Sequence, residues 1–224
     1  MGVIAPALKA GTLTEALKER TWALHTQAER SGIINDILRK KADRRGYALL
    51  LRNLLPAYRA MEQALRLGRH RSIFRAFARP ELYRTAWIES DLSALMGEKW
   101  HTDLPEFPAA LLYAERLAAA AEGDGGRLVA HAYVRYFGDL SGGQILKKLL
   151  GNALKLPPEA LSFYEFPGIA DPAAFKTMMR DAIDGDVASS CVSEAVIDEA
   201  LRAFEYNIAI SQAVQDALVS KSRP

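Results

Sequence analysis

A glycine-interrupted helical pattern over residues 131–148, HAYVRYFGDLSGGQILKK, constrains this chain more than any other stretch. Apolar residues recur at helical spacing across it. Gly138, Gly142 and Gly143 nevertheless fall in the middle of the pattern. Each internal glycine costs a helix about 1 kcal/mol relative to alanine, so this cluster requires a physical reason.

Two explanations fit the three glycines. Gly138 and Gly142 are four positions apart and so share one helix face, with Gly143 beside them, which would let a flat ligand lie against bare backbone. Alternatively, the glycines allow two helices to pack closely, or the helix breaks there. Asp139 and Ser141 favour the ligand, because polar groups among the glycines would face that ligand or its ordered water.

The composition is that of an ordinary globular protein. The chain has 224 residues, of which 50% are hydrophobic and 25% charged, enough to bury one substantial core. We therefore expect one all-helical domain over residues 12–219, with flexible ends at 1–11 and 220–224. The 29 basic and 27 acidic residues give a formal charge of only +2, which argues against a dedicated nucleic-acid-binding protein.

Cysteine content and hydropathy indicate the compartment. Cys191 is the single cysteine, so the chain cannot form an internal disulfide and a reducing compartment is expected. The start MGVIAPALKAG lacks the basic residues and long apolar run of a signal peptide. No run of 18 apolar residues occurs. These features predict a cytoplasmic protein without a membrane anchor.

Start and stop signals place the remaining helices. Thr12 and Glu15 fit a capping box, and Gly32 is expected to end the first helix. Residues 97–107 read as a loop. The expected helices run from Thr12 to about Arg30, from Asp43 to Gly68, over 81–96, from Pro108, through the glycine-bearing stretch after Gly126, from Asp171, and over 193–218.

The first helix carries a chemically distinctive face. Lys18, Trp22, His25 and Glu29 are spaced four, three and four residues apart, so they lie in a row. His25 could bind a metal through one ring nitrogen while Glu29 orients the other. The alternative is an ordinary surface or core histidine.

Polar residues on three later helices are further candidates. Lys176 and Arg180 stand one turn apart, where they would face water or bind a pair of ligand carboxylates. Tyr58 is a polar-tipped residue in an otherwise apolar helix. Asn207 interrupts an apolar stripe that includes Phe204, and so could face a pocket.

Four segments together resemble the heme oxygenase family. They are TWALHTQAE (21–29), HAYVRYFGDLSGGQ (131–144), AAFKTMMR (173–180) and AFEYN (203–207). They occur in the family's order and span nearly the whole chain. The combination of HTQAE with GDLSGGQ is highly specific to that family.

This resemblance implies an all-α fold in which heme lies between the first helix and a kinked, glycine-rich distal helix. His25 would be the iron ligand and Glu29 its hydrogen-bonding neighbour, with the glycines forming the distal surface. Asp139 would anchor distal water. The resemblance further implies that Arg135, Tyr58 and Asn207 support Asp139, that Lys18, Tyr133, Lys176 and Arg180 meet the heme propionates, and that Phe204 contacts the heme.

The implied reaction is the O2-dependent opening of heme at the α-meso carbon, giving biliverdin IXα, carbon monoxide and ferrous iron. The electrons must come from outside, because the chain has no GxGxxG motif and one cysteine. A soluble donor, such as ferredoxin or a flavin reductase, would dock on basic residues 39–45 and 147–148.

Two other classes of protein stay open. A heme carrier or sensor would need only His25 and the propionate-binding cations. The second class is a heme-free protein with the same fold, such as a protein of thiamine or quinone-cofactor metabolism or a di-iron protein. Against the di-iron version, the sequence lacks paired Glu-x-x-His motifs. Against any heme-free protein, the His25, glycine and Lys176/Arg180 set has no evident use without a planar dianionic ligand.

Overall fold

The computed structural model describes residues 11–188 and 193–221, and every regular element in these ranges is a helix. The predicted all-α class is therefore confirmed. Cys191 and most of the ends predicted to be flexible lie outside the described residues. The α-helices are α1 (Leu13–Glu29), α2 (Gly32–Leu38), α3 (Arg44–Leu67), α4 (Thr85–Met96), α5 (Trp100–Asp103), α6 (Pro108–Ala120), α7 (Gly126–Asp139), α8 (Gly142–Leu154), α9 (Pro172–Ala182) and α10 (Ser193–Lys221).

Shorter helical turns connect several of these helices. Four are single 3₁₀ turns, and a π-helical segment continues α9. No helix among residues 11–188 and 193–221 is both long and apolar enough to cross a membrane. The short elements are Ser72–Phe74, Pro80–Leu82, Pro158–Ala160, Ser162–Tyr164 and the π-helical Ile183–Val187.

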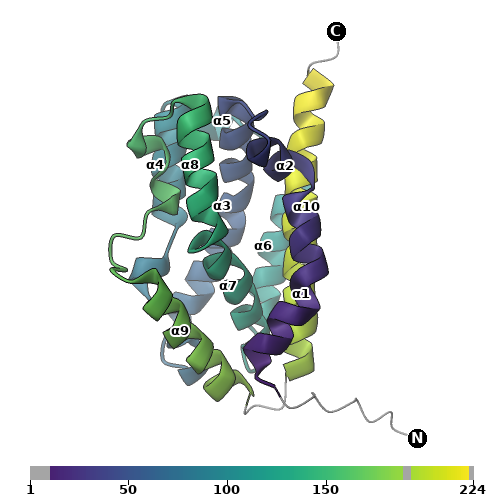
Figure 1. The fold of residues 1–224 in the computed structure, drawn as a ribbon, viewed down its shortest axis with the longest axis vertical. Helices are drawn as coiled ribbons and strands as arrows, with labels where there is room; N and C mark the ends of the chain where they lie inside the picture. The colour runs from purple at the N-terminus through teal and green to yellow at the C-terminus, as the bar shows by residue number, and fades with distance from the viewer. Residues whose placement is uncertain (1–10, 189–192, 222–224) are drawn as a thin grey trace, which may run out of the picture.

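The long helices pack around one shared apolar core. α10 packs against α1, α7, α3 and α6, and α3 packs against α4 and α6 (Figure 1). Residues from nearly every α-helix contribute to the core, for example Leu17 of α1, Leu51 of α3 and Ile210 of α10. α9 lies apart from α1, on the opposite side of α7 in Figure 1.

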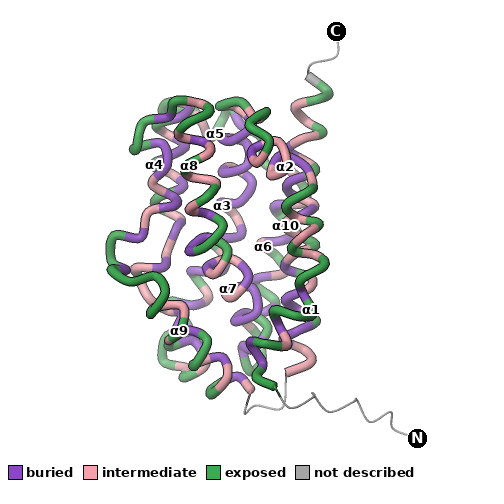
Figure 2. Tube along the Cα trace, viewed as in Figure 1, coloured by how far each residue is buried: buried purple, intermediate pink, exposed green. Residues whose placement is uncertain are grey.

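The capping box at the start of α1 is present as predicted. The Thr12 hydroxyl accepts from the backbone N–H of Glu15 at 3.2 Å, and the Glu15 carboxylate accepts from the Thr12 N–H at 3.0 Å. The buried residues of α1 are Leu13, Thr14, Leu17 and Thr21. No residue of α1 after Thr21 is buried. The second half of α1 is thus largely exposed (Figure 2), because one of its faces borders a cavity.

The turn after α1 differs from the prediction. α1 ends at Glu29, and Gly32 opens the short helix α2, which the sequence did not predict. Gly32 has φ +55°, and a β-carbon there would lie 2.3 Å from the backbone of Ser211 in α10. The Ser211 hydroxyl donates to the Ser31 carbonyl at 2.9 Å and accepts from the Ile34 N–H at 3.1 Å. These contacts hold the start of α2 against α10 and redirect the chain after α1.

Two other predicted boundaries were wrong. The helix expected over 81–96 begins at Thr85, because the chain first forms a 3₁₀ turn and then buries the side chain of Arg84. The loop expected over 97–107 contains the short helix α5. In the glycine-bearing stretch the chain forms two helices, the break that was one of the two explanations of the glycines, since Ser141 leaves helical geometry at φ −121° and ψ −85° and separates α7 from α8.

Candidate functional site

A cavity of about 430 Å³ lies between α1 on one side and α7 and α8 on the other. Ile34 and Leu38 of α2, residues of α3 and α10, and Phe163 and Tyr164 of the Ser162–Tyr164 turn also line it. The face of α1 predicted from spacing and the glycine cluster of α7 and α8 thus border the same space. The predicted residues that line it are Lys18, Trp22, His25, Glu29, Tyr133, Arg135, Gly138, Asp139, Gly142, Gly143, Phe204 and Asn207.

Two of the three glycines leave open space beside the backbone. A β-carbon added at Gly138 or Gly142 would meet no atom within 4 Å. At Gly143 the added carbon would lie 3.0 Å from the ring of Tyr164, so this glycine makes room for a neighbouring side chain. Gly138 and Gly142 thus leave bare backbone at the cavity, whereas close packing explains Gly143.

His25 lies on the opposite wall with its side chain 47% exposed. Its imidazole lies between Trp22, whose ring plane is parallel within 2°, and Phe204 of α10, whose ring is tilted by 66°. Both ring centroids are 5.8 Å away. The Glu29 carboxylate is 3.9 Å from His25 Nδ1, within ion-pair range but too far for a hydrogen bond.

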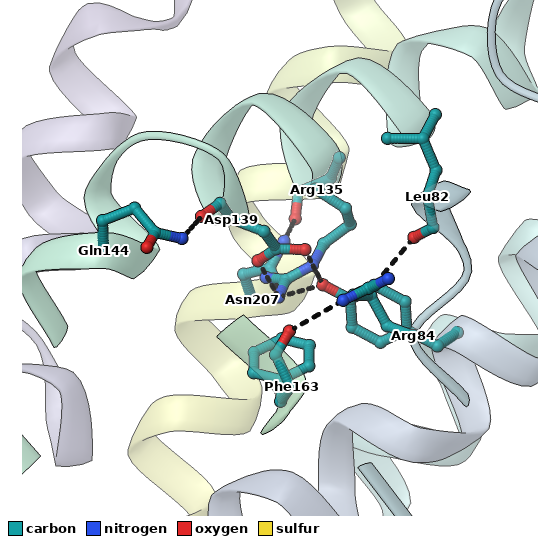
Figure 3. Close-up of polar contacts among 9 residues, drawn as sticks. Leu82, Arg84, Arg135, Asp139, Gln144, Phe163 and Asn207 are labelled. Carbon is teal, nitrogen blue, oxygen red and sulfur yellow. Dashed lines mark hydrogen bonds and ion pairs between the residues drawn. The ribbon is translucent and has the colours of Figure 1, made fainter. Parts of the chain in front are cut away.

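A polar cluster that is part of the cavity lining is centred on Asp139 (Figure 3). The Tyr58 hydroxyl of α3 donates a hydrogen bond to Asp139 Oδ2. Arg135 donates to the Tyr58 oxygen from Nε at 2.9 Å and from Nη2 at 2.7 Å, and approaches Asp139 Oδ1 at 3.4 Å. The predicted association of these three side chains is therefore present.

Burial controls the charges in this cluster. Loss of hydration raises the pKa of Asp139 above its ordinary value, and the positive charge of Arg135 opposes that rise. Burial also raises the pKa of Tyr58 well above its ordinary value. Burial alone would lower the pKa of Arg135, but its interactions with Tyr58 and Asp139 outweigh that effect and raise it. Arg135 is therefore a partly buried cation in this cluster.

Asn207 connects the cluster to α10. Its Oδ1 accepts from Arg135 Nη1 at 2.7 Å, and its amide nitrogen donates to the Ala203 carbonyl at 2.6 Å (Figure 3). The apolar stripe of the last helix was therefore correctly read as interrupted by a pocket residue. Gln144, to which the sequence reasoning gave no role, donates to the Tyr164 carbonyl at 2.9 Å. Its place in the GDLSGGQ motif was the available signal.

The predicted cations occupy two positions relative to the cavity. Lys18 lines it, whereas Lys176 and Arg180 of α9 do not. Lys176 donates to the Ser141 hydroxyl at 2.9 Å, and Arg180 lies 5.3 Å from the centre of the Phe137 ring. Ser141 and Phe137 both line the cavity. Each of the two cations therefore contacts a cavity-lining side chain without lining the cavity itself.

Sequence reasoning missed two buried residues that hold the wall behind Gly143. Arg84 donates to the Leu82 carbonyl at 2.9 Å and to the Phe163 carbonyl at 3.3 Å (Figure 3). Asp91 accepts from the N–H of Ser162 at 2.8 Å and of Phe163 at 2.9 Å. Burial raises the pKa of Asp91 to about 6. Isolated polar residues with distant backbone partners give no sequence pattern, so nothing pointed to them.

A second buried charged cluster was also missed. His131 Nε2 lies 2.8 Å from Glu199 Oε1, and Arg116 Nε donates to the same oxygen at 2.7 Å. Hydrogen bonds from His131 and Arg116 overcome the effect of burial and lower the pKa of Glu199 to about 2. The cluster joins α6, α7 and α10, and thus fixes the helices that carry Arg135 and Asn207.

Solved structures share this architecture. The structure of heme oxygenase-1 from the cyanobacterium Synechocystis in complex with heme superposes with a TM-score of 0.87 at 34% identity, covering 94% of this chain and 96% of that one. Heme oxygenase from Leptospira interrogans superposes with a TM-score of 0.85 at 33% identity, covering 91% of this chain and 100% of that one. The fold is that of the heme oxygenases.

Sequence comparison gives the same family. The family model described as heme oxygenase matches residues 11–213. Human heme oxygenase 1 is 37% identical over 214 residues, which cover 94% of this chain and 74% of the human protein. Heme oxygenase 1 of Synechocystis is 34% identical over 207 residues, covering 92% and 86% of the two chains. The chain belongs to the heme oxygenase family of heme-degrading enzymes.

Proposed function

We propose that this protein binds heme in the cavity between α1 and the α7–α8 glycine wall and opens its ring at the α-meso carbon. The products are biliverdin IXα, carbon monoxide and ferrous iron. The observation that carries the proposal is the pairing of two opposed walls. His25 stands on one, and Gly138 and Gly142 leave open space on the other.

The residues present fit a flat iron-containing ligand. His25, half-exposed on the α1 wall opposite the glycines, could hold the iron of heme through a ring nitrogen. Bound heme supplies the iron at which O2 is reduced. The open backbone at Gly138 and Gly142 then permits close approach on the side opposite His25, and no glycine can act as an acid there.

Asp139 acts through water in this proposal. Asp139 lines the cavity, and its carboxylate is held by contacts with Tyr58 and Arg135. A carboxylate fixed in this way can hold ordered water and pass a proton through it to the oxygen side of the heme. Asn207 keeps Arg135 in place by accepting from its Nη1 atom. In this proposal Asp139 delivers the proton for ring opening through water and does not donate it directly.

Cations at the cavity edge set the regiochemistry. Lys18 and Tyr133 line the cavity, and Lys176 and Arg180 stand just outside it, so together they can meet two propionates. Such contacts fix the rotation of a nearly symmetric disc and so select which meso carbon is attacked. We assign the α-meso carbon by family resemblance.

We also propose a soluble external electron donor, such as ferredoxin or a flavin reductase. Arg39, Lys40, Lys41 and Arg44 are exposed around the α2–α3 connection and would suit an acidic partner. Lys147 is less suited than the sequence suggested, because it is paired with Glu165. A cytoplasmic location and a single domain over residues 12–219 belong to the same proposal.

A single-turnover reaction tests the function. Purified protein with one equivalent of hemin receives a reductase in air, and the products are separated chromatographically and assayed for carbon monoxide. We expect one bilin isomer, biliverdin IXα, with one equivalent of carbon monoxide. Intact heme after demonstrated reduction would instead identify a heme carrier, and another bilin isomer would contradict the α assignment.

A further inference from the structure

Trp22 has no role in the function proposed so far, although it lies beside His25 in the cavity wall. Its side chain is 62% exposed, and it lines the cavity one turn after Lys18. Single exposed apolar side chains are common on proteins, so exposure alone means little. What distinguishes Trp22 is the ring it touches.

Two aromatic rings lie next to the imidazole of His25. The indole of Trp22 is parallel to it within 2°, and Phe204 approaches at 66° from α10. The Glu29 carboxylate, at 3.9 Å from Nδ1, is too distant to hold the ring by a hydrogen bond. In the described part of the chain, ring contacts therefore fix the imidazole plane.

We propose that Trp22 is a positioning residue that sets the plane of the His25 imidazole and packs against heme once heme is bound. The inference rests on the ligation of heme iron by His25 proposed above. Phe204 alone approaches one side of the imidazole, which would leave the ring free to turn about its Cβ–Cγ bond. The parallel indole on the neighbouring turn removes that freedom, so less rotational entropy is lost when the iron–nitrogen bond forms.

Loss of Trp22 is expected to affect heme and not the fold. The residue is absent from the apolar core, and its exposed ring supports no other helix. Trp22→Ala should therefore unfold at the wild-type temperature without heme. Trp22→Phe keeps an aromatic ring, whereas Trp22→Leu keeps apolar bulk without one. Trp87, 36% exposed and not part of the cavity lining, gives the matched control Trp87→Ala.

Two measurements on the hemin complexes separate these variants. The first is the rate at which hemin transfers to excess apomyoglobin. The second is the proton NMR spectrum of the ferric cyanide complex, whose shifted heme-methyl resonances depend on the imidazole plane. We expect roughly three- to tenfold faster hemin release from Trp22→Ala and Trp22→Leu, the range of one aromatic contact. Their methyl resonances should be redistributed, and Trp22→Phe and Trp87→Ala should resemble the wild type.

The outcomes are distinguishable from failure of the proposed function. Wild-type protein that does not shift the Soret band of hemin would overturn heme binding itself. Wild-type protein that binds hemin, together with Trp22→Ala of unchanged release rate and unchanged methyl resonances, would overturn only the role of Trp22. Wild-type resonances in Trp22→Leu would also overturn it, because apolar bulk rather than the ring would then suffice.

Discussion

The hydroxyl of Tyr58 donates a hydrogen bond to the carboxylate of Asp139, joining α3 to the last residue of α7 across 81 positions of the sequence. Arg135 donates to the same hydroxyl, so an acid, a phenol and a cation share one site. Tyr58 thus contacts Oδ2 of Asp139 and Arg135 approaches Oδ1, while Asp139 also belongs to the cavity lining. Our predictions begin with this residue.

Asp139→Ala should abolish ring opening while hemin still binds. Without the carboxylate, the ordered water that delivers the proton loses its anchor, and positioned acid–base groups contribute about 10²- to 10⁴-fold to rate. The measurement is bilin yield in a single turnover with saturating hemin. Asp139→Asn, which keeps the shape but not the charge, is the companion variant. A normal bilin yield from Asp139→Ala would refute this role.

Gly138→Ala and Gly143→Ala should behave in opposite ways. A methyl group at Gly138 enters open space inside α7, so the unfolding free energy should stay constant or rise by up to about 1 kcal/mol while hemin affinity falls. At Gly143 the methyl group presses on Tyr164, which should destabilise the fold by about 1–3 kcal/mol. Urea unfolding and hemin titration of both variants test the pair. Equal loss of stability in both would show that position 138 is not open.

Glu199 should make stability depend on acidity. Its pKa is lowered from 4.5 to about 2 by His131 and Arg116, so its stabilising effect is complete above about pH 4.5 and is lost as the pH falls toward 2. Glu199→Gln should reduce the unfolding free energy by about 3–5 kcal/mol at neutral pH, because the buried His131 and the partly buried Arg116 both lose their carboxylate partner. Urea unfolding at several pH values should show this deficit shrinking below pH 4.5. A loss of unfolding free energy that stays constant with pH would contradict the ion pairs of Glu199 with His131 and Arg116.

Removal of the α9 cations should change the product. In Lys176→Ala/Arg180→Ala, the propionates lose two contacts, and the heme disc can rotate in its plane. We expect biliverdin isomers other than IXα alongside it, measured by chromatography after single turnover. Asp171→Asn, at the start of the same helix, is a control for disturbance of α9 itself, since its side chain caps Ala173 and Ala174. Pure IXα from the double variant would assign regiochemistry to other residues.

Local patterns predicted most of the long helices and placed residues on the two cavity walls, but missed the short helices α2 and α5. The spacing of Lys18, Trp22, His25 and Glu29 places all four in one cavity lining, because a regular helix determines its own faces. The capping box at Thr12 fixed the start of α1 for the same local reason.

Contacts between distant segments could not be predicted in the same way. The turn at Gly32 depends on the backbone of Ser211, and the wall behind Gly143 depends on Arg84 and Asp91. His131 and Glu199, which likewise pair across two helices, are 68 residues apart in the sequence. Such pairings are set by how helices pack, and a single sequence contains no periodic signal for them.

The most direct test of the account is an absorption time course of the protein with one equivalent of hemin, in air, after addition of ascorbate or a reductase. We predict loss of the Soret band with growth of a broad red bilin absorption, and neither change in His25→Ala under the same conditions. A wild-type Soret band that persists after demonstrated reduction would contradict ring opening. Equal bilin formation by His25→Ala would contradict the assignment of His25 as the iron ligand.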